Sequence, residues 1–167
     1  MTEVHFIVPA GIDDPARPSG GNTYDRRVRD ALRALGWTVR EHVGVRAVEE
    51  LPDGAVALLD GLIASPAPDV LLPHAERLRP VVLMHMPFAD ARERAVVEAA
   101  TAIIVTSEWT RRRLGELYGV RAHVARPGVD PAEPVAGSPR WAGPCTSTSV
   151  RPRSSGCRTA PSSCSTG

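Results

Sequence analysis

Three short segments of the chain carry residues that can bind or transform a small ligand, and each comes after an apolar run, the first at the end of the long loop Pro9–Ser19. They are Ser19-Gly20-Gly21-Asn22, His85 and Thr106-Ser107-Glu108-Trp109-Thr110. Glycine lets the backbone approach a ligand closely, and free N–H groups at a helix start favour an anion such as phosphate or carboxylate. The Gly-Gly segment therefore predicts an anion site. The alternative is that the two glycines only form a tight turn into a helix.

His85 ends an apolar run, Val81-Val82-Leu83-Met84, and is followed by Met86-Pro87-Phe88. An imidazole at such a place can donate a hydrogen bond or move a proton near neutral pH. The alternative is a structural histidine that hydrogen-bonds to the backbone. The remaining histidines are scattered and lack metal-ligand spacing: His5, His42, His74 and His123.

Ser107 and the arginines that follow it can each be explained by a structural role as well as by a functional one. The Ser107 hydroxyl can reach the same site, but serine is also a preferred N-cap for the helix that follows. The run Arg111-Arg112-Arg113 is typical of a solvated helix face. It supports at most a weak association with a membrane surface.

Several classes of protein are excluded by missing motifs and by charge. The chain has no G-x-G-x-x-G dinucleotide fingerprint, no P-loop and no G-x-S-x-G nucleophile elbow. Its three cysteines form no C-x-x-C pair and offer neither a disulfide framework nor a zinc site. The first 137 residues hold sixteen arginines and all 19 acidic residues, so no basic nucleic-acid footprint exists there. We therefore expect no metal, no resident cofactor and no nucleic-acid partner.

Short, mostly apolar and often β-branched runs alternate with helical patterns, which indicates buried parallel strands joined by helices. The predicted strands are Val4–Val8, Thr38–His42, Ala55–Leu59, Val81–His85, Ala102–Thr106 and Ala122–Ala125. The predicted helices are Tyr24–Leu35, Asp69–Leu78, Ala89–Ala100 and Glu108–Tyr118, with Gly36 as a C-terminal stop for the first.

This alternation predicts an α/β fold with a Rossmann-like, doubly wound parallel sheet. In such sheets, ligands bind beyond the carboxyl ends of the strands. The three polar segments all follow predicted strands, so we expect them at one edge of the sheet.

The composition changes near residue 137. Residues 138–167 contain twelve Ser or Thr, four Pro, four Arg and no acidic residue. A stretch so poor in apolar residues buries too little surface to offset its ordering entropy. We predict one domain over residues 1–136 and a disordered tail over 137–167, which we interpret as a frameshift or truncation product. The N-terminus lacks a basic leader and no apolar stretch reaches membrane-spanning length, so we expect a soluble, cytoplasmic protein.

Taken in order, these segments resemble the N-terminal half of family 4 glycosyltransferases, which have the two-domain GT-B fold. The resemblance covers residues 1 to about 136 and includes the Gly-Gly loop, the strand ending in His85, the strand-Ser107-helix segment and Arg126-Pro127-Gly128-Val129-Asp130. The last motif departs from the Pro-Asn-Gly-Val-Asp of many relatives. The donor-side motifs of the family, among them Glu-x7-Glu and a basic pair for phosphate, find no match after Val135.

The resemblance implies transfer of a sugar from a nucleotide-sugar donor to an acceptor, with retention at the anomeric carbon and without an obligatory metal. It implies that His85 is catalytic, in contact with the transferred sugar or the acceptor, and that Gly20 and Gly21 line the cleft. Asn22, Tyr24 and Ser107 are the further substrate-binding candidates. The partners would be the acceptor, the nucleotide sugar and a missing C-terminal domain, so this chain alone should be inactive. The alternative is a stand-alone Rossmann-like module that binds a small molecule without turnover.

Overall fold

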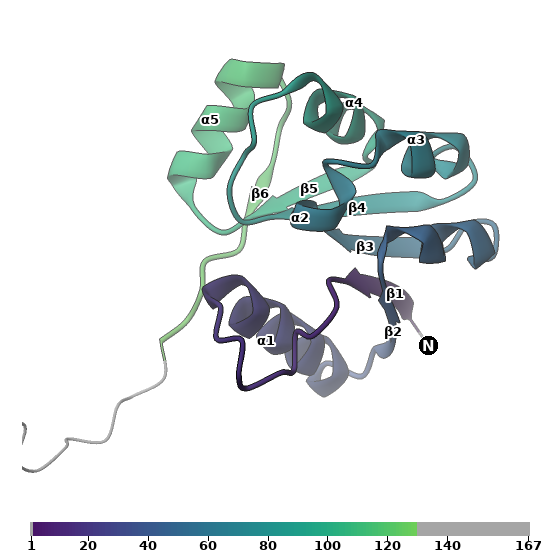
Figure 1. The fold of residues 1–167 in the computed structure, drawn as a ribbon, viewed down its shortest axis with the longest axis vertical. Coiled ribbons are helices and arrows are strands. Elements are labelled where there is room, and N and C mark those ends of the chain that lie inside the picture. Colours follow the sequence, from purple (N-terminus) through teal and green to yellow (C-terminus); the bar gives the residue numbers. More distant parts are fainter. Residues whose placement is uncertain (1, 130–167) are drawn as a thin grey trace, which may run out of the picture. The chain divides into compact units, whose positions relative to one another are not determined.

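The computed structural model describes residues 2–129, in which strands and helices alternate (Figure 1). The strands are β1 (Glu3–Val8), β2 (Thr38–Val43), β3 (Val56–Asp60), β4 (Arg79–Met84), β5 (Ala102–Val105) and β6 (His123–Val124). The helices are α1 (Gly20–Ala34), α2 (Gly61–Ala64), α3 (Pro68–Leu71), α4 (Ala91–Ala99) and α5 (Glu108–Tyr118), with 3-10 helices η1 (Val45–Glu50) and η2 (Leu72–His74). The predicted domain end at residue 136 and the predicted tail lie outside the described residues.

The six strands form one parallel sheet in the order β2-β1-β3-β4-β5-β6. This confirms the predicted α/β class and the Rossmann-like sheet, with small shifts at the strand ends. β2 lies on one side of β1 and β3 lies on the other, so the direction in which strands are added across the sheet reverses after β2. In doubly wound sheets this switch in strand order, at the carboxyl edge, is the place where ligands bind.

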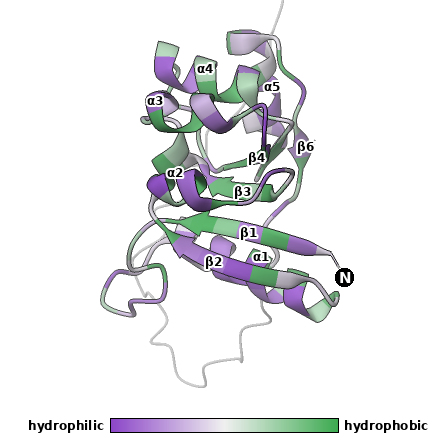
Figure 2. Cartoon of the chain, turned by 90° about the vertical axis from the view of Figure 1, so that its right-hand side faces the viewer, coloured by the Kyte–Doolittle hydropathy of each residue, from purple (hydrophilic) through white to green (hydrophobic). Residues whose placement is uncertain are grey.

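Helices cover both faces of the sheet, as a doubly wound fold requires (Figure 1). The helix α1 packs on one face through Tyr24, Val28 and Leu32, against strand residues that include Phe6 and Leu83. The other helices pack on the opposite face over a larger core, whose fully buried residues include Ile7, Leu59, Val82, Val96 and Leu114. Figure 2 shows hydrophobic colour along β1, β3 and β4, which lie between these layers. Strand residues alternate between the two faces, as the two-residue repeat of a strand dictates.

Three helical segments differ from the sequence prediction, and the first is α1, which begins at Gly20 rather than at Tyr24. The helix predicted over Asp69–Leu78 is wrong, because the segment folds as the short α3 followed by the 3-10 helix η2. Pro73 lies at the junction, and a proline inside a helix lacks the N–H that a continued α-helix needs. The helix α4 begins at Ala91 rather than Ala89, because Ala89 has a left-handed φ of 63° and the Asp90 side chain caps the helix.

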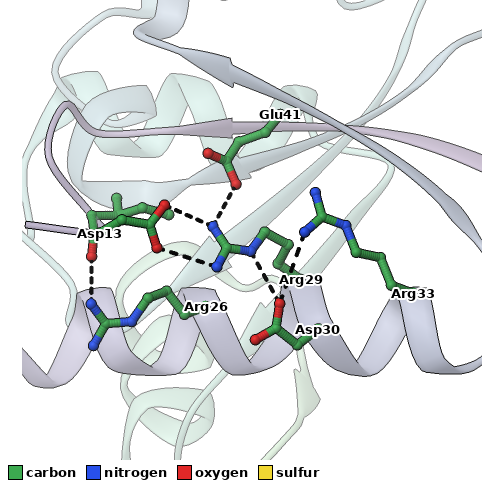
Figure 3. A network of polar contacts seen from close by, with 7 residues as sticks. Asp13, Arg26, Arg29, Asp30, Arg33 and Glu41 are labelled. Carbon is green, nitrogen blue, oxygen red and sulfur yellow. Dashed lines mark hydrogen bonds and ion pairs between the residues drawn. The ribbon is translucent and has the colours of Figure 1, made fainter.

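The loop between β1 and α1 is held against α1 by arginines (Figure 3). The Arg29 guanidinium donates to both carboxylate oxygens of Asp13, at 2.9 and 3.2 Å, and to Glu41 on β2 at 2.9 Å. Arg26 donates to the Ile12 carbonyl oxygen at 2.8 Å. The hydrogen bond from Arg29 lowers the pKa of Asp13. These contacts fix the loop that leads to Gly20, and so fix the entry to α1.

None of the described helices is long and apolar enough to cross a membrane.

Candidate functional site

The candidate site lies at the carboxyl edge of the sheet, where β3, β4 and the start of α1 meet. Leu58 on β3 and Leu83 on β4 face α1. Successive side chains of a strand alternate between its two faces, so Asp60, two residues after Leu58, and His85, two residues after Leu83, lie on the same side. Asp25 lies in the first turns of α1 and faces them. The sheet order therefore brings together three ionisable side chains that are far apart in the sequence.

The strongest contact in the site joins His85 to Asp25. The His85 Nε2 atom lies 3.1 Å from Asp25 Oδ1. The Asp25 side chain is 0% exposed and the His85 side chain is 25% exposed. Such a contact between imidazole and a buried carboxylate fixes the orientation of the ring. His85 is thus a paired residue that still reaches solvent, unlike a histidine satisfied by backbone alone.

Asp60 lies behind this pair and is 2% exposed. Its Oδ1 atom accepts a hydrogen bond of 2.6 Å from the Leu62 backbone N–H and so caps α2. Burial, and then its closeness to Asp25, raise the pKa of Asp60 to about 7. Two buried carboxyl groups side by side resist double ionisation, so Asp60 is about half protonated at neutral pH.

The pKa of His85 responds to the same neighbours. Desolvation by burial lowers the pKa, but the hydrogen bond and the charge of Asp25, together with the charge of Asp60, outweigh it and raise the pKa of His85 above its ordinary value. The raised pKa favours the protonated ring. Such a ring can donate a hydrogen bond to a ligand and carry positive charge at the crevice.

Gly20 and Gly21 are the first two residues of α1, and Ser19 is the N-cap, so they do not form a turn before the helix. Neither glycine has a positive φ, and no hydrogen bond to another described residue is recorded for their N–H groups. A Cβ added at Gly21 would lie 3.6 Å from both Nε2 and Cδ2 of His85, whereas one added at Gly20 would have no atom within 4 Å. Gly21 therefore leaves space beside His85, at a helix N-terminus that favours anions.

Tyr24 lies against His85, whereas Asn22 does not take part in the cluster. The Tyr24 ring meets the His85 ring edge-on, with ring centroids 5.4 Å apart. Its hydroxyl donates to the Ala125 carbonyl oxygen at 2.7 Å, which ties α1 to the segment after β6. Burial raises the pKa of Tyr24. The Asn22 backbone N–H donates to Ser19 Oγ, and the described residues provide no recorded partner for its side chain.

The Ser107 hydroxyl caps α5, which is the structural alternative that the sequence already offered. It accepts from the Thr110 N–H at 3.0 Å and shares a hydrogen bond with the Thr110 hydroxyl. The neighbouring Thr106, rather than Ser107, reaches the site, because its hydroxyl donates to the His85 carbonyl oxygen at 3.3 Å. Two of the three arginines on α5 form ion pairs along the helix, Arg111 with Glu108 and Arg113 with Glu116, as a solvated face does.

The loop that follows His85 is held by the buried carboxylate of Glu93. The carboxylate accepts hydrogen bonds from the Phe88 N–H at 2.9 Å and the Ala89 N–H at 3.0 Å, and from the Tyr118 hydroxyl at 2.5 Å. Burial and the hydrogen bond to Glu93 raise the pKa of Tyr118, which keeps the phenol protonated as a donor. Glu93 thus positions the backbone around His85 without reaching the site.

Asp25 and Asp60 were missed by the sequence reasoning, although Asp60 ends an apolar strand just as His85 does. Among residues 2–129, Asp25, Asp60 and His85 each offer one ligand atom to a possible cation. These three atoms all lie within 4.8 Å of one another. Hydrogen bonding accounts for Asp25 Oδ1, Asp60 Oδ1 and His85 Nε2, and we assign no metal there. The arrangement can bind an anion beside a histidine of raised pKa.

Comparisons of the chain with family models, curated proteins and solved structures give no match.

Proposed function

We propose that this chain is the acceptor-side domain of a retaining, two-domain GT-B glycosyltransferase of family 4, working in the cytoplasm. The intact enzyme would transfer a sugar from a nucleotide-sugar donor to an acceptor. The observation that carries the proposal is the position of Gly21, whose missing side chain leaves space 3.6 Å from His85 at the N-terminus of α1. The resemblance in sequence implies a cleft in that place, with a glycine pair and a histidine lining it.

The geometry supports defined roles for these residues. A sugar hydroxyl or phosphoryl oxygen beside Gly20 and Gly21 would meet backbone N–H groups and the positive end of the α1 dipole. The Cδ2–Nε2 edge of His85 lies beside this place, and the raised pKa of His85 favours the charged ring, which would attract an anionic oxygen there. Stabilisation of a departing nucleotide needs further positive charge, which the donor-side domain would supply.

The proposal is tested by joining this domain to a donor-side domain. The coding sequence beyond residue 136, read in each frame, should yield a second Rossmann-like domain, and the extended protein should transfer a sugar from a nucleotide sugar. The chain as it stands should show no transfer with common nucleotide sugars. Turnover by the chain alone would contradict the proposal that transfer needs a donor-side domain. Binding of a small molecule without turnover by the extended protein would favour a stand-alone binding module.

A further inference from the structure

The carboxyl groups of Asp25 and Asp60 are buried side by side next to His85, which is electrostatically unfavourable if both are ionised. Asp25 is 0% exposed and Asp60 is 2% exposed, and their oxygens lie within 4.8 Å of each other and of the imidazole. Burying two ionised carboxylates side by side costs several kcal/mol unless one is neutralised or both are paired. One proton on the pair removes this cost.

The hydrogen bonds indicate where that proton lies. Asp25 Oδ1 faces His85 Nε2, while Asp25 Oδ2 is buried and has no hydrogen-bond partner recorded among the described residues. Asp60 already accepts from the Leu62 N–H through Oδ1. A proton on the Asp60 carboxyl therefore gives Asp25 Oδ2 a donor from within the cluster, and Asp25 itself stays ionised.

An ionised Asp25 dictates the tautomer of His85. A carboxylate only accepts hydrogen bonds, so the Nε2 atom at 3.1 Å must carry a hydrogen. In the neutral ring, Nδ1 is then without a hydrogen, and it gains one only when the ring is protonated. The Cδ2–Nε2 edge of the ring faces Asp25 and Gly21, so Nδ1 belongs to the opposite edge.

We infer that Asp25 is a positioning residue that holds His85 in the Nε2–H tautomer, with Asp60 as the hydrogen-bond donor that lets Asp25 remain ionised while buried. His85 Nδ1 is then the ring atom left to hydrogen-bond a part of the ligand on the side of the ring away from Gly21. The raised pKa values of Asp60 and His85 agree with this arrangement. The meeting of Nδ1 with a sugar ligand rests on the proposed function, whereas the pairing of the three side chains does not.

Nitrogen NMR of the histidine rings tests the pairing on the chain as it stands. His85→Gln identifies the His85 signals by their loss. In the wild-type protein we expect the neutral His85 ring to be the Nε2–H tautomer. In Asp25→Asn we expect the tautomer preference to disappear and the pKa of His85 to fall by at least about one unit, a tenfold loss of proton affinity.

Two further variants separate the roles of the carboxyl groups. Asp60→Asn keeps a neutral donor toward Asp25, so we expect the Nε2–H tautomer to persist. Asp30→Asn removes an exposed carboxylate from the same helix, which contacts Arg29 and not the cluster, and should leave the His85 signals unchanged. An Nδ1–H tautomer in the wild-type protein, or an unchanged pKa of His85 in Asp25→Asn, would overturn the inference. If Asp25→Asn does not fold, the wild-type tautomer and its persistence in Asp60→Asn decide the matter.

A cation in place of the proton is also detectable. Stoichiometric Mn²⁺ that broadens His85 signals selectively, and does so less in Asp60→Asn, would show a metal site and overturn the inference. In a two-domain enzyme, Asp25→Asn should lower kcat and shift the pH profile while leaving KM for the donor close to wild type. A failure to detect sugar transfer would contradict the proposed function but would leave the NMR result standing.

Discussion

At the scale of single residues, Gly21 and Gly20 provide a matched pair for testing the site. A methyl at Gly21 would come within 3.6 Å of the His85 ring, while one at Gly20 meets no atom within 4 Å. Neither residue needs a positive φ, so neither change strains the backbone. The difference between the two variants should therefore report on the space beside His85 rather than on the fold.

In the two-domain version, Gly21→Ala and His85→Ala should each lower sugar transfer at least ~10-fold, which corresponds to about 1.4 kcal/mol of transition-state stabilisation. Steady-state kinetics measures the loss, and melting temperature should change little. Gly20→Ala is the control and should retain most of the activity, although its alanine also favours the helix slightly. Near wild-type rates in both Gly21→Ala and His85→Ala would refute the assignment of the cleft.

The raised pKa of Asp60 predicts how stability depends on pH. Its value of about 7 in the folded chain exceeds the ordinary 3.8, so the folded state binds more protons than the unfolded state between these values. The contribution of Asp60 to stability is therefore present at low pH and is lost as the pH rises through about 7. His85, whose pKa is also raised, adds to this direction, whereas His42, whose pKa is lowered by burial, opposes it.

Asp60→Asn keeps the cap on α2 and a donor toward Asp25 but cannot ionise. We expect the wild-type chain to lose about 2–3 kcal/mol more of its free energy of unfolding than this variant loses between pH 5 and pH 8. Urea unfolding at the two pH values measures the difference. If the free energy of unfolding changes equally with pH in the two proteins, Asp60 is ionised in the folded state.

At the scale of elements, the caps and buried carboxylates determine how the segments after the strands are presented. Ser107 caps α5 and Glu93 holds the loop after β4, and neither reaches the crevice directly. These residues position the elements that carry the site. Their substitution should therefore affect stability more than chemistry.

Ser107→Ala should lower the free energy of unfolding by about 1 kcal/mol, because the Thr110 N–H loses its acceptor at the start of α5. Denaturant melts measure the loss. Ser107→Asp, which retains a capping oxygen, should remain close to wild type. In a two-domain enzyme the effect of Ser107→Ala on rate should be smaller than that of His85→Ala, and a larger effect would restore Ser107 as a substrate-binding residue.

At the scale of the whole described unit, large apolar side chains gather in the segments that follow the carboxyl ends of the strands. Leu62 is 58% exposed after β3, Met86 is 70% and Phe88 is 48% exposed after β4, and Trp109 is 57% exposed after β5. Apolar residues grouped on a surface favour association. The proposed second domain would cover this edge in the intact enzyme.

The chain alone should therefore self-associate through this edge. Combined replacement of Met86 and Trp109 by Ser should reduce association in sedimentation velocity at increasing concentration. Leu35→Ser is the matched control, since Leu35 is 75% exposed but follows α1 at the opposite edge of the sheet, and it should leave association unchanged. A monodisperse wild-type monomer at high concentration would argue for an autonomous binding module instead.

Local patterns in the sequence determined most of the secondary structure. Apolar, β-branched runs predicted all six strands, because a strand covered on both faces needs apolar residues at successive positions. The capping serine and Gly119 framed α5 correctly, since caps act within a few residues of a helix end. The helix predicted over segment 69–78 was wrong, because Pro73 lies where the α-helix would have to continue.

The candidate site was only partly visible in the sequence. His85 stood out because it ends an apolar run, and the glycines stood out because they close the loop between the first strand and the first helix. Asp25 and Asp60 did not, although the two-residue alternation of β3 places Asp60 on the same face as Leu58. The tertiary structure decided their pairing, because strand order sets which segments meet at the crevice and periodicity carries no information on strand order. Residues 25, 60 and 85 become neighbours only when β3 pairs with β1, β4 pairs with β3, and the start of α1 lies at their carboxyl ends.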